Sequence, residues 1–125
     1  MEGSDYLRFE DLDVWKEAAR LSAQIYKKLK ILRDFSFRDH LSKTSLSISS
    51  NIAEGFERQS HREFIKLLIY AKGSCGELRS QIYIGIDIDY IDSETGKKWI
   101  DQTLKISSMI SNLIKTRRSF LRNSQ

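Results

Sequence analysis

The chain has 125 residues, of which 40% are hydrophobic and 30% charged, so it can bury one core and is not expected to be disordered. Its single cysteine excludes an intrachain disulfide, and no apolar run approaches the ~18 residues of a membrane span. The net charge is +4, and the whole excess lies in residues 102–125, which carry five basic and no acidic side chains. We therefore expect a single domain over residues 1–125, in a reducing, cytoplasmic setting.

The chain contains no proline, which favours long helices joined by short connections. Four segments carry apolar residues at helical spacing. They predict an all-α fold, an antiparallel up-and-down four-helix bundle, with helices at about 11–33, 37–57, 61–88 and 93–118.

The first two segments have contrasting compositions. In the first, a stripe of period three to four is formed by Leu12, Trp15, Ala19, Ser22, Tyr26 and Leu29, and Ala18, Ile25 and Leu32 widen it. Ser36 can then cap the second helix. The second segment has a seam and many serines, which would allow a close approach of a neighbouring backbone; a serine-rich loop is the alternative. This seam is Leu41, Ser45, Ile48, Ile52 and Phe56.

The third segment begins with a capping box, in which Ser60 accepts from the Glu63 amide and the Glu63 side chain reaches back to the Ser60 amide. Gly73 and Gly76 lie within it, either as contact points between helices or as two weak spots. Its apolar face is formed by Phe64, Leu67, Leu68, Ala71, Cys75, Leu78 and Ile82.

Residues 82–91 are ambiguous, because Ile82, Ile84, Ile86 and Ile88 alternate as in a strand. No other segment alternates, so a strand here would have no partner for its backbone donors. The interpretation is therefore a helix to about Ile88 and a turn at 89–90. The fourth segment then begins at Asp92 or Ser93 and fades near 117–118.

Motifs for catalysis, metal binding or cofactor binding are missing from the sequence. It has two histidines, no Glu-x-x-His pair, no phosphate loop and no Gly-x-Ser-x-Gly elbow. His61, at a helix start, is expected to be solvated, and Cys75 to pack as a small apolar group. We expect no catalytic residue, no metal and no cofactor, and hence not an enzyme.

Two groups of polar residues remain as candidates. Around the second connection we expect a structural polar clamp, with a binding or catalytic role as the alternative, formed by Asn51, Glu54, Arg58, Ser60 and Glu63. The C-terminal cations could complement the helix dipole or contact phosphates, with Phe120 able to stack on a base. These cations are Lys105, Lys115, Arg117, Arg118 and Arg122.

Three ordered pieces of the sequence resemble a known family. The main one is 47–60, Ser-Ile-Ser-Ser-Asn-Ile-Ala-Glu-Gly-Phe-Glu-Arg-Gln-Ser, followed by Glu63-Phe64. It is similar to the signature of the 23S rRNA intervening-sequence proteins, also called the four-helix-bundle protein family. Phe9-Glu-Asp-Leu-Asp-Val-Trp15 and Ala71-Lys-Gly-Ser-Cys-Gly-Glu-Leu78 resemble two flanking pieces of the same family.

The resemblance implies a homopentamer and an association with RNA or DNA. The family includes relatives of the retroelement accessory variability determinant, a basic pentameric barrel that engages a reverse transcriptase. The chain departs from the signature at Ser49, in place of proline, and at Glu57, in place of glycine. Lys43 stands with Ser42 where two arginines are common, and Asp89 stands at a common glycine, so we expect Asp89 to be left-handed.

We therefore expect a non-enzymatic homo-oligomer that binds structured nucleic acid, RNA in preference to DNA, through Lys43 and the C-terminal cations. Five copies at +4 would carry +20, a strong field for a polyanion. Tyr6, Phe9 and Phe56 are expected at the contacts between copies. The alternative is a protein-binding scaffold, or an accessory subunit for a nucleic-acid enzyme such as a reverse transcriptase.

Overall fold

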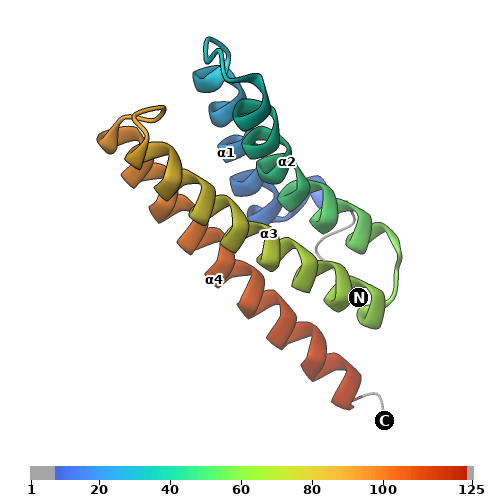
Figure 1. The fold of residues 1–125 in the computed structure, drawn as a ribbon. Helices are drawn as coiled ribbons and strands as arrows, with labels where there is room; N and C mark the ends of the chain where they lie inside the picture. Colours follow the sequence, from blue (N-terminus) through green and yellow to red (C-terminus); the bar gives the residue numbers. More distant parts are fainter. Residues whose placement is uncertain (1–7, 124–125) are drawn as a thin grey trace.

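A computed structural model describes residues 8–123 of the chain, and this range contains helices and no strand. A short 3-10 turn, η1 (Phe9–Asp11), is followed by α1 (Asp13–Leu29), α2 (Phe35–Glu57), α3 (His61–Asp87) and α4 (Ser93–Asn123). The helices run alternately in opposite directions, and each packs on its neighbours in sequence, with α4 closing back onto α1 (Figure 1). The predicted all-α, antiparallel four-helix bundle is confirmed.

The helices differ greatly in length, and this difference shapes one end of the bundle. α1 has 17 residues and α4 has 31, so α1 covers only part of its neighbour. The last turns of α4 continue beyond it (Figure 1). No helix within residues 8–123 is both long enough and apolar enough to cross a membrane.

The second and third helices bury the seams that the sequence predicts. In α2, Leu41, Ser45, Ile48 and Ile52 are completely buried, whereas Phe56 is half-buried. All seven predicted face residues of α3 are buried. Burial raises the pKa of the Cys75 thiol to about 12, as expected for a cysteine that packs as an apolar group.

The small residues of α2 permit close contacts with both neighbours. The Ser22 and Ser45 hydroxyls lie 3.0 Å apart between α1 and α2, and the Ser47 hydroxyl lies 2.8 Å from that of Ser74 on α3. Gly55 lies under α3, where a Cβ would come 2.9 Å from Cδ1 of Phe64. The close approach expected from the serines is therefore present on both sides of this helix.

The predicted stripe of the first helix is correct only in part. The helix buries Ile25 as predicted, but it also buries Val14 and Leu21, which lie outside the predicted stripe. The predicted member Tyr26 is 43% exposed. Since α1 packs against both α2 and α4, its buried face points between them rather than along the line of aromatic residues. The helix also ends at Leu29 instead of 33, because Leu32 extends the apolar period from a loop.

Two local predictions about helix ends and glycines are also wrong. Asp34, not Ser36, caps α2, and its Oδ1 accepts from the Phe37 amide at 3.1 Å, so the helix starts two residues earlier than predicted. Gly73 and Gly76 are not contact points within the chain, since a Cβ at either would meet no atom within 4 Å.

The ambiguous stretch is helical, as predicted. α3 runs through the alternating isoleucines to Asp87, and Asp89 follows with a φ of 63°, in the left-handed region. The amides of Tyr90 and Ile91 then donate to the Gly85 carbonyl at 2.9 and 3.1 Å, which closes the turn. α4 begins at Ser93 as expected but continues to Asn123, five residues beyond its predicted end.

Candidate nucleic-acid interface

Three exposed cations follow one side of the last turns of α4. Lys115, Arg118 and Arg122 are spaced three and four residues apart, which places them one above another on a helix surface. All three are exposed, and Asp101 is the last acidic residue of the sequence. The structure thus places these cations together on one helix, whereas the predicted helix ended before Arg122; we call them the α4 cation row.

Arg117 belongs to the same turns but points the other way, towards α3. Its guanidinium carbon lies 4.6 Å from the centre of the Phe64 ring, and its Nη1 lies 3.1 Å from Nδ1 of His61. Burial lowers the pKa of Arg117 from its ordinary value, which reflects the cost of holding the charge away from water. Arg117 therefore acts first as a packing residue between α3 and α4.

His61 is half-buried, so the prediction of a solvated side chain is wrong. Its ring lies 5.3 Å from that of Phe120, and its Nδ1 faces Arg117. Burial, and then the charge of Arg117, lower the pKa of His61 below its ordinary value of 6.5. The neutral ring is the form that can accept a hydrogen bond from Arg117, because arginine only donates.

The other two predicted cations lie apart from the α4 cation row. Lys105 is paired with Glu17 of α1, with Nζ and Oε2 3.4 Å apart. Lys43 is exposed on α2, which starts at the same end of the bundle as α4 (Figure 1). At 1.5 Å per residue, Lys43 lies about 12 Å along its helix and Lys115 about 33 Å along its own. The predicted six-residue surface is therefore divided in the fold.

The predicted polar clamp forms around Arg58, at the turn between α2 and α3. Arg58 contacts Glu54 Oε2 through Nη2 at 2.7 Å and Glu63 Oε1 through Nη1 at 2.9 Å. The hydrogen bond and charge of Glu54, with a smaller contribution from Glu63, raise the pKa of Arg58. The Ser60 hydroxyl accepts from the Glu63 amide at 3.3 Å, which confirms the first half of the capping box.

Two details of the predicted clamp are wrong. The Glu63 carboxylate is turned to Arg58 instead of the Ser60 amide, because an ion pair is available one turn away. Asn51 is not a member: its Nδ2 donates at 2.8 Å to the Ser47 carbonyl of its own helix. The clamp fixes the start of α3, and so the position of His61 and Phe64 beneath Arg117.

Sequence reasoning missed Arg62 and Lys66, which are exposed on the first turns of α3. They lie at the same end of the bundle as the α4 cation row, since His61 beside them contacts Arg117 and Phe120. The predicted antiparallel order of the last two helices could have indicated these residues, because it brings the start of the third helix beside the end of the fourth. Within residues 8–123, no three His, Cys, Asp or Glu residues gather as metal ligands would.

Two of the aromatic residues expected at contacts between copies also pack within the chain. Phe9 packs edge-on against Trp15, with ring centres 5.2 Å apart, and Phe56 packs against Phe64 at 5.9 Å. Both phenylalanines remain half-buried. Tyr6, the third expected contact, lies outside the described residues.

Comparisons with known proteins identify one family and one solved structure of similar fold. A family model described as 23S rRNA-intervening sequence protein matches residues 10–112. A crystal structure of a protein with unknown function from the S23 ribosomal protein family of Bacteroides thetaiotaomicron is similar, with a TM-score of 0.76. The two sequences are 24% identical, and the match covers 82% of this chain and 98% of that one. No curated protein matches the chain.

Proposed function

From the premise that the chain belongs to the 23S rRNA-intervening sequence protein family, we propose that it is a non-enzymatic, homo-oligomeric adaptor for structured nucleic acid. The proposed ligand is RNA in preference to DNA, and the proposed location is the cytoplasm. The observation that carries the proposal is the α4 cation row, exposed on a helix whose last turns extend beyond α1.

The electrostatics of this row suit a polyanion. Three exposed cations with no acid later in the sequence can each displace a counterion from a phosphate backbone. Arg62 and Lys66 extend the positive surface onto α3. Such contacts position a nucleic acid without reading its bases, so we expect binding to be governed by shape and charge.

Phe120 has a smaller place in this proposal than the sequence indicates. It is 48% exposed, but one side of its ring is turned to His61, 5.3 Å away. The remaining surface could contact a base, whereas insertion between two bases would require the ring to leave His61. We therefore assign the affinity to the cations.

The outer face of α3 supports self-association. It carries four large apolar side chains that are 45–58% exposed, namely Ile69, Tyr70, Tyr83 and Ile84, and the C-cap residue Ile88 is 44% exposed. Between them lie Gly73 and Gly76, with open space above each. An apolar stripe with small residues at its middle is typical of a surface that another helix covers. In the proposed assembly, a pentamer by family resemblance, a second copy packs here.

A binding comparison tests the proposal. Lys115→Ser, Arg118→Ser and Arg122→Ser, combined in one variant, should weaken binding of a structured RNA at least tenfold, by fluorescence anisotropy at fixed salt. The matched control combines Lys16→Ser, Lys27→Ser and Lys30→Ser, which removes the same charge from exposed positions of the α1 region. Equal losses in the two variants would assign binding to net charge alone and contradict the proposed surface.

The second candidate function is a protein-binding scaffold, including an accessory subunit for a nucleic-acid enzyme. The α3 face favours it as well, because a different protein could cover the same apolar stripe. The two candidates differ in what the purified chain does alone. The adaptor should sediment as a homo-oligomer, whereas a scaffold whose apolar stripe is covered by a different protein should sediment as a monomer when that protein is absent.

A further inference from the structure

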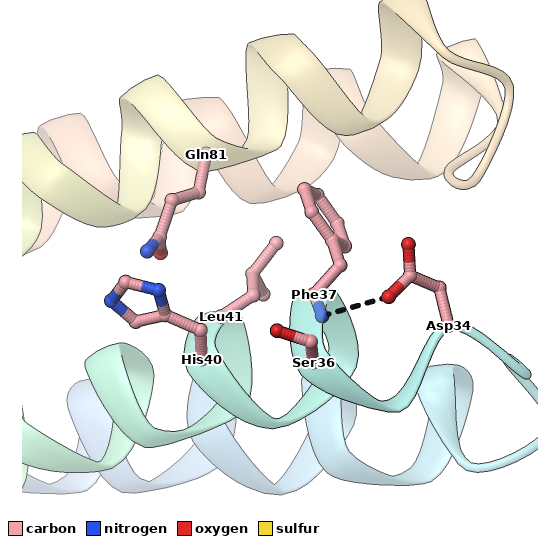
Figure 2. A pocket seen from close by; sticks show the side chains of 6 residues that line it. All are labelled: Asp34, Ser36, Phe37, His40, Leu41 and Gln81. Atoms are coloured by element: carbon pink, nitrogen blue, oxygen red, sulfur yellow. Dashed lines mark hydrogen bonds between the residues drawn. The ribbon is translucent and has the colours of Figure 1, made fainter.

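A hollow of about 350 Å³ opens between the first turns of α2 and the later turns of α3 (Figure 2). Leu41 is completely buried and Phe37 half-buried, so these two give the hollow an apolar base. The remaining groups that line it are polar. They are Asp34, Ser36, His40 and Gln81.

Gln81 presents an acceptor that the chain leaves without a donor. Among residues 8–123, its Oε1 is the one buried side-chain nitrogen or oxygen with no hydrogen-bond partner. The side chain leaves α3 and directs its amide across the hollow towards His40 on α2 (Figure 2). Buried polar atoms are almost always paired, so this one indicates an occupant that donates.

The charges around the hollow are negative. The Asp34 carboxylate accepts from the Phe37 amide and, through Oδ2, from the Tyr90 hydroxyl at 2.9 Å. These two bonds lower the pKa of Asp34, so it is ionised at neutral pH. Glu77, one turn before Gln81 on α3, lies 3.5 Å from Nε2 of His40.

The nearest arginine on α2 is engaged outside the hollow. Arg38 contacts the Asp39 carboxylate at 2.9 Å and lies 4.6 Å above the Phe35 ring. The Asp34 carboxylate and an unpaired amide oxygen therefore line the hollow, and the Glu77 carboxylate lies next to it, in contact with His40. No lysine or arginine lines it.

From this juxtaposition we propose that the hollow binds an alkylguanidinium group, such as the side chain of an arginine. The planar guanidinium carries five N–H donors, so one cation can donate to Gln81 and also pair with a carboxylate. Its alkyl stem would lie on Phe37 and Leu41. The site lies at the opposite end of the bundle from the α4 cation row. The proposal that it binds a guanidinium group is therefore independent of the proposal that the row binds nucleic acid.

The test is a titration of the ¹⁵N-labelled full chain, followed by NMR. The probes are n-butylguanidinium and its uncharged analogue n-butylurea. The cation should give saturable shifts in the backbone amides of 34–41 and 77–81 and in the side-chain amide of Gln81, and the urea should bind at least tenfold more weakly. A second pair, agmatine and a capped arginine peptide, separates a free ligand from a partner's side chain, and binding of either supports the proposal.

Variants then identify the acceptor. Gln81→Met keeps the length of the side chain and removes the amide, and should weaken the guanidinium about tenfold; Gln81→Leu serves if the first variant misfolds. The control is Gln102→Met in a second hollow of about 340 Å³, which also contains a carboxylate, Asp101, but is lined by Lys98. This change should leave binding unaltered.

Three results would overturn the proposal. They are equal binding of the urea, unchanged affinity in both Gln81 variants, and absence of any shift in the hollow. The last result is the one expected if a second copy of the chain already covers Gln81 and supplies its donor. None of these results bears on the affinity of the α4 cation row for RNA.

Discussion

The guanidinium carbon of Arg117 lies over the Phe64 ring, 4.6 Å from its centre, and this contact joins the end of α4 to the start of α3. Cation–π contacts of this kind are stronger when the cation is partly removed from water. Arg117 thus holds the helix turns that present Lys115, Arg118 and Arg122, and it does so from the inner side.

We expect Arg117→Ala to lower the free energy of unfolding by about 1–2 kcal/mol, since it removes the cation and the apolar stem that covers Phe64. Arg118→Ala, one residue later on the exposed side, should change it by less than about 0.5 kcal/mol. Urea denaturation measures both values. Equal effects of the two substitutions would show that Arg117 is not a packing residue.

Acidification should weaken the same contact. The pKa of His61 in the folded chain lies below its ordinary value of 6.5, so the unfolded chain binds the proton more readily. The stabilisation is complete above about pH 6.5 and declines as the pH falls through the lowered folded value. Protonated His61 can no longer accept from Arg117, and the two like charges repel.

The urea midpoint at pH 7.5 and pH 5 measures this effect. The wild type should lose more stability between the two values than His61→Gln, which cannot titrate. Asp and Glu residues contribute equally to both proteins and therefore cancel in the comparison. Identical losses of stability in the two proteins would show that His61 does not contribute to the pH dependence.

Two glycines should respond in opposite directions to the same substitution. At Gly55, an alanine Cβ would lie 2.9 Å from Phe64 and 3.0 Å from Leu67, so Gly55→Ala should destabilise by about 1–3 kcal/mol. At Gly73 there is open space, so Gly73→Ala should stabilise the isolated fold by about 0.5–1 kcal/mol through helix propensity. Thermal unfolding of the two variants measures both effects. If Gly73→Ala lowered the stability at low protein concentration, the result would contradict the open space above Gly73.

The outer face of α3 gives a separate prediction about assembly. Ile84→Glu places a charge within the apolar stripe and should shift the chain to monomers in sedimentation velocity. Leu104→Glu is the matched control, because Leu104 is similarly exposed, at 49%, on α4. If Leu104→Glu dissociated the assembly and Ile84→Glu did not, the interface would lie on α4 instead of α3.

The interior of the bundle was largely predictable from spacing. α2 and α3 each bury one continuous face, so apolar residues three and four apart identified the seams directly. The buried face of α1 was predicted only in part, because α1 lies between two helices and the sequence does not say in which direction its face points. The strand-like isoleucines were resolved by the lack of any partner strand.

The candidate site was predictable only in part. A cluster of cations is visible in the sequence, but which of them point outwards depends on a contact between residues 56 positions apart, Arg117 and His61. Long side chains carry both a charge and an apolar stem, so their role is decided by the neighbouring helix. Asp34 was missed as a cap for a similar reason, since Tyr90 from another loop helps to hold it.

The salt dependence of RNA binding tests the central claim most directly. Plots of log affinity against log salt concentration should be steep for the wild type, and the variant lacking Lys115, Arg118 and Arg122 should lose about 2–3 units of slope per engaged subunit. The α1 control should keep the wild-type slope. A variant without the α4 cation row that retains both the affinity and the slope of the wild type would contradict the account.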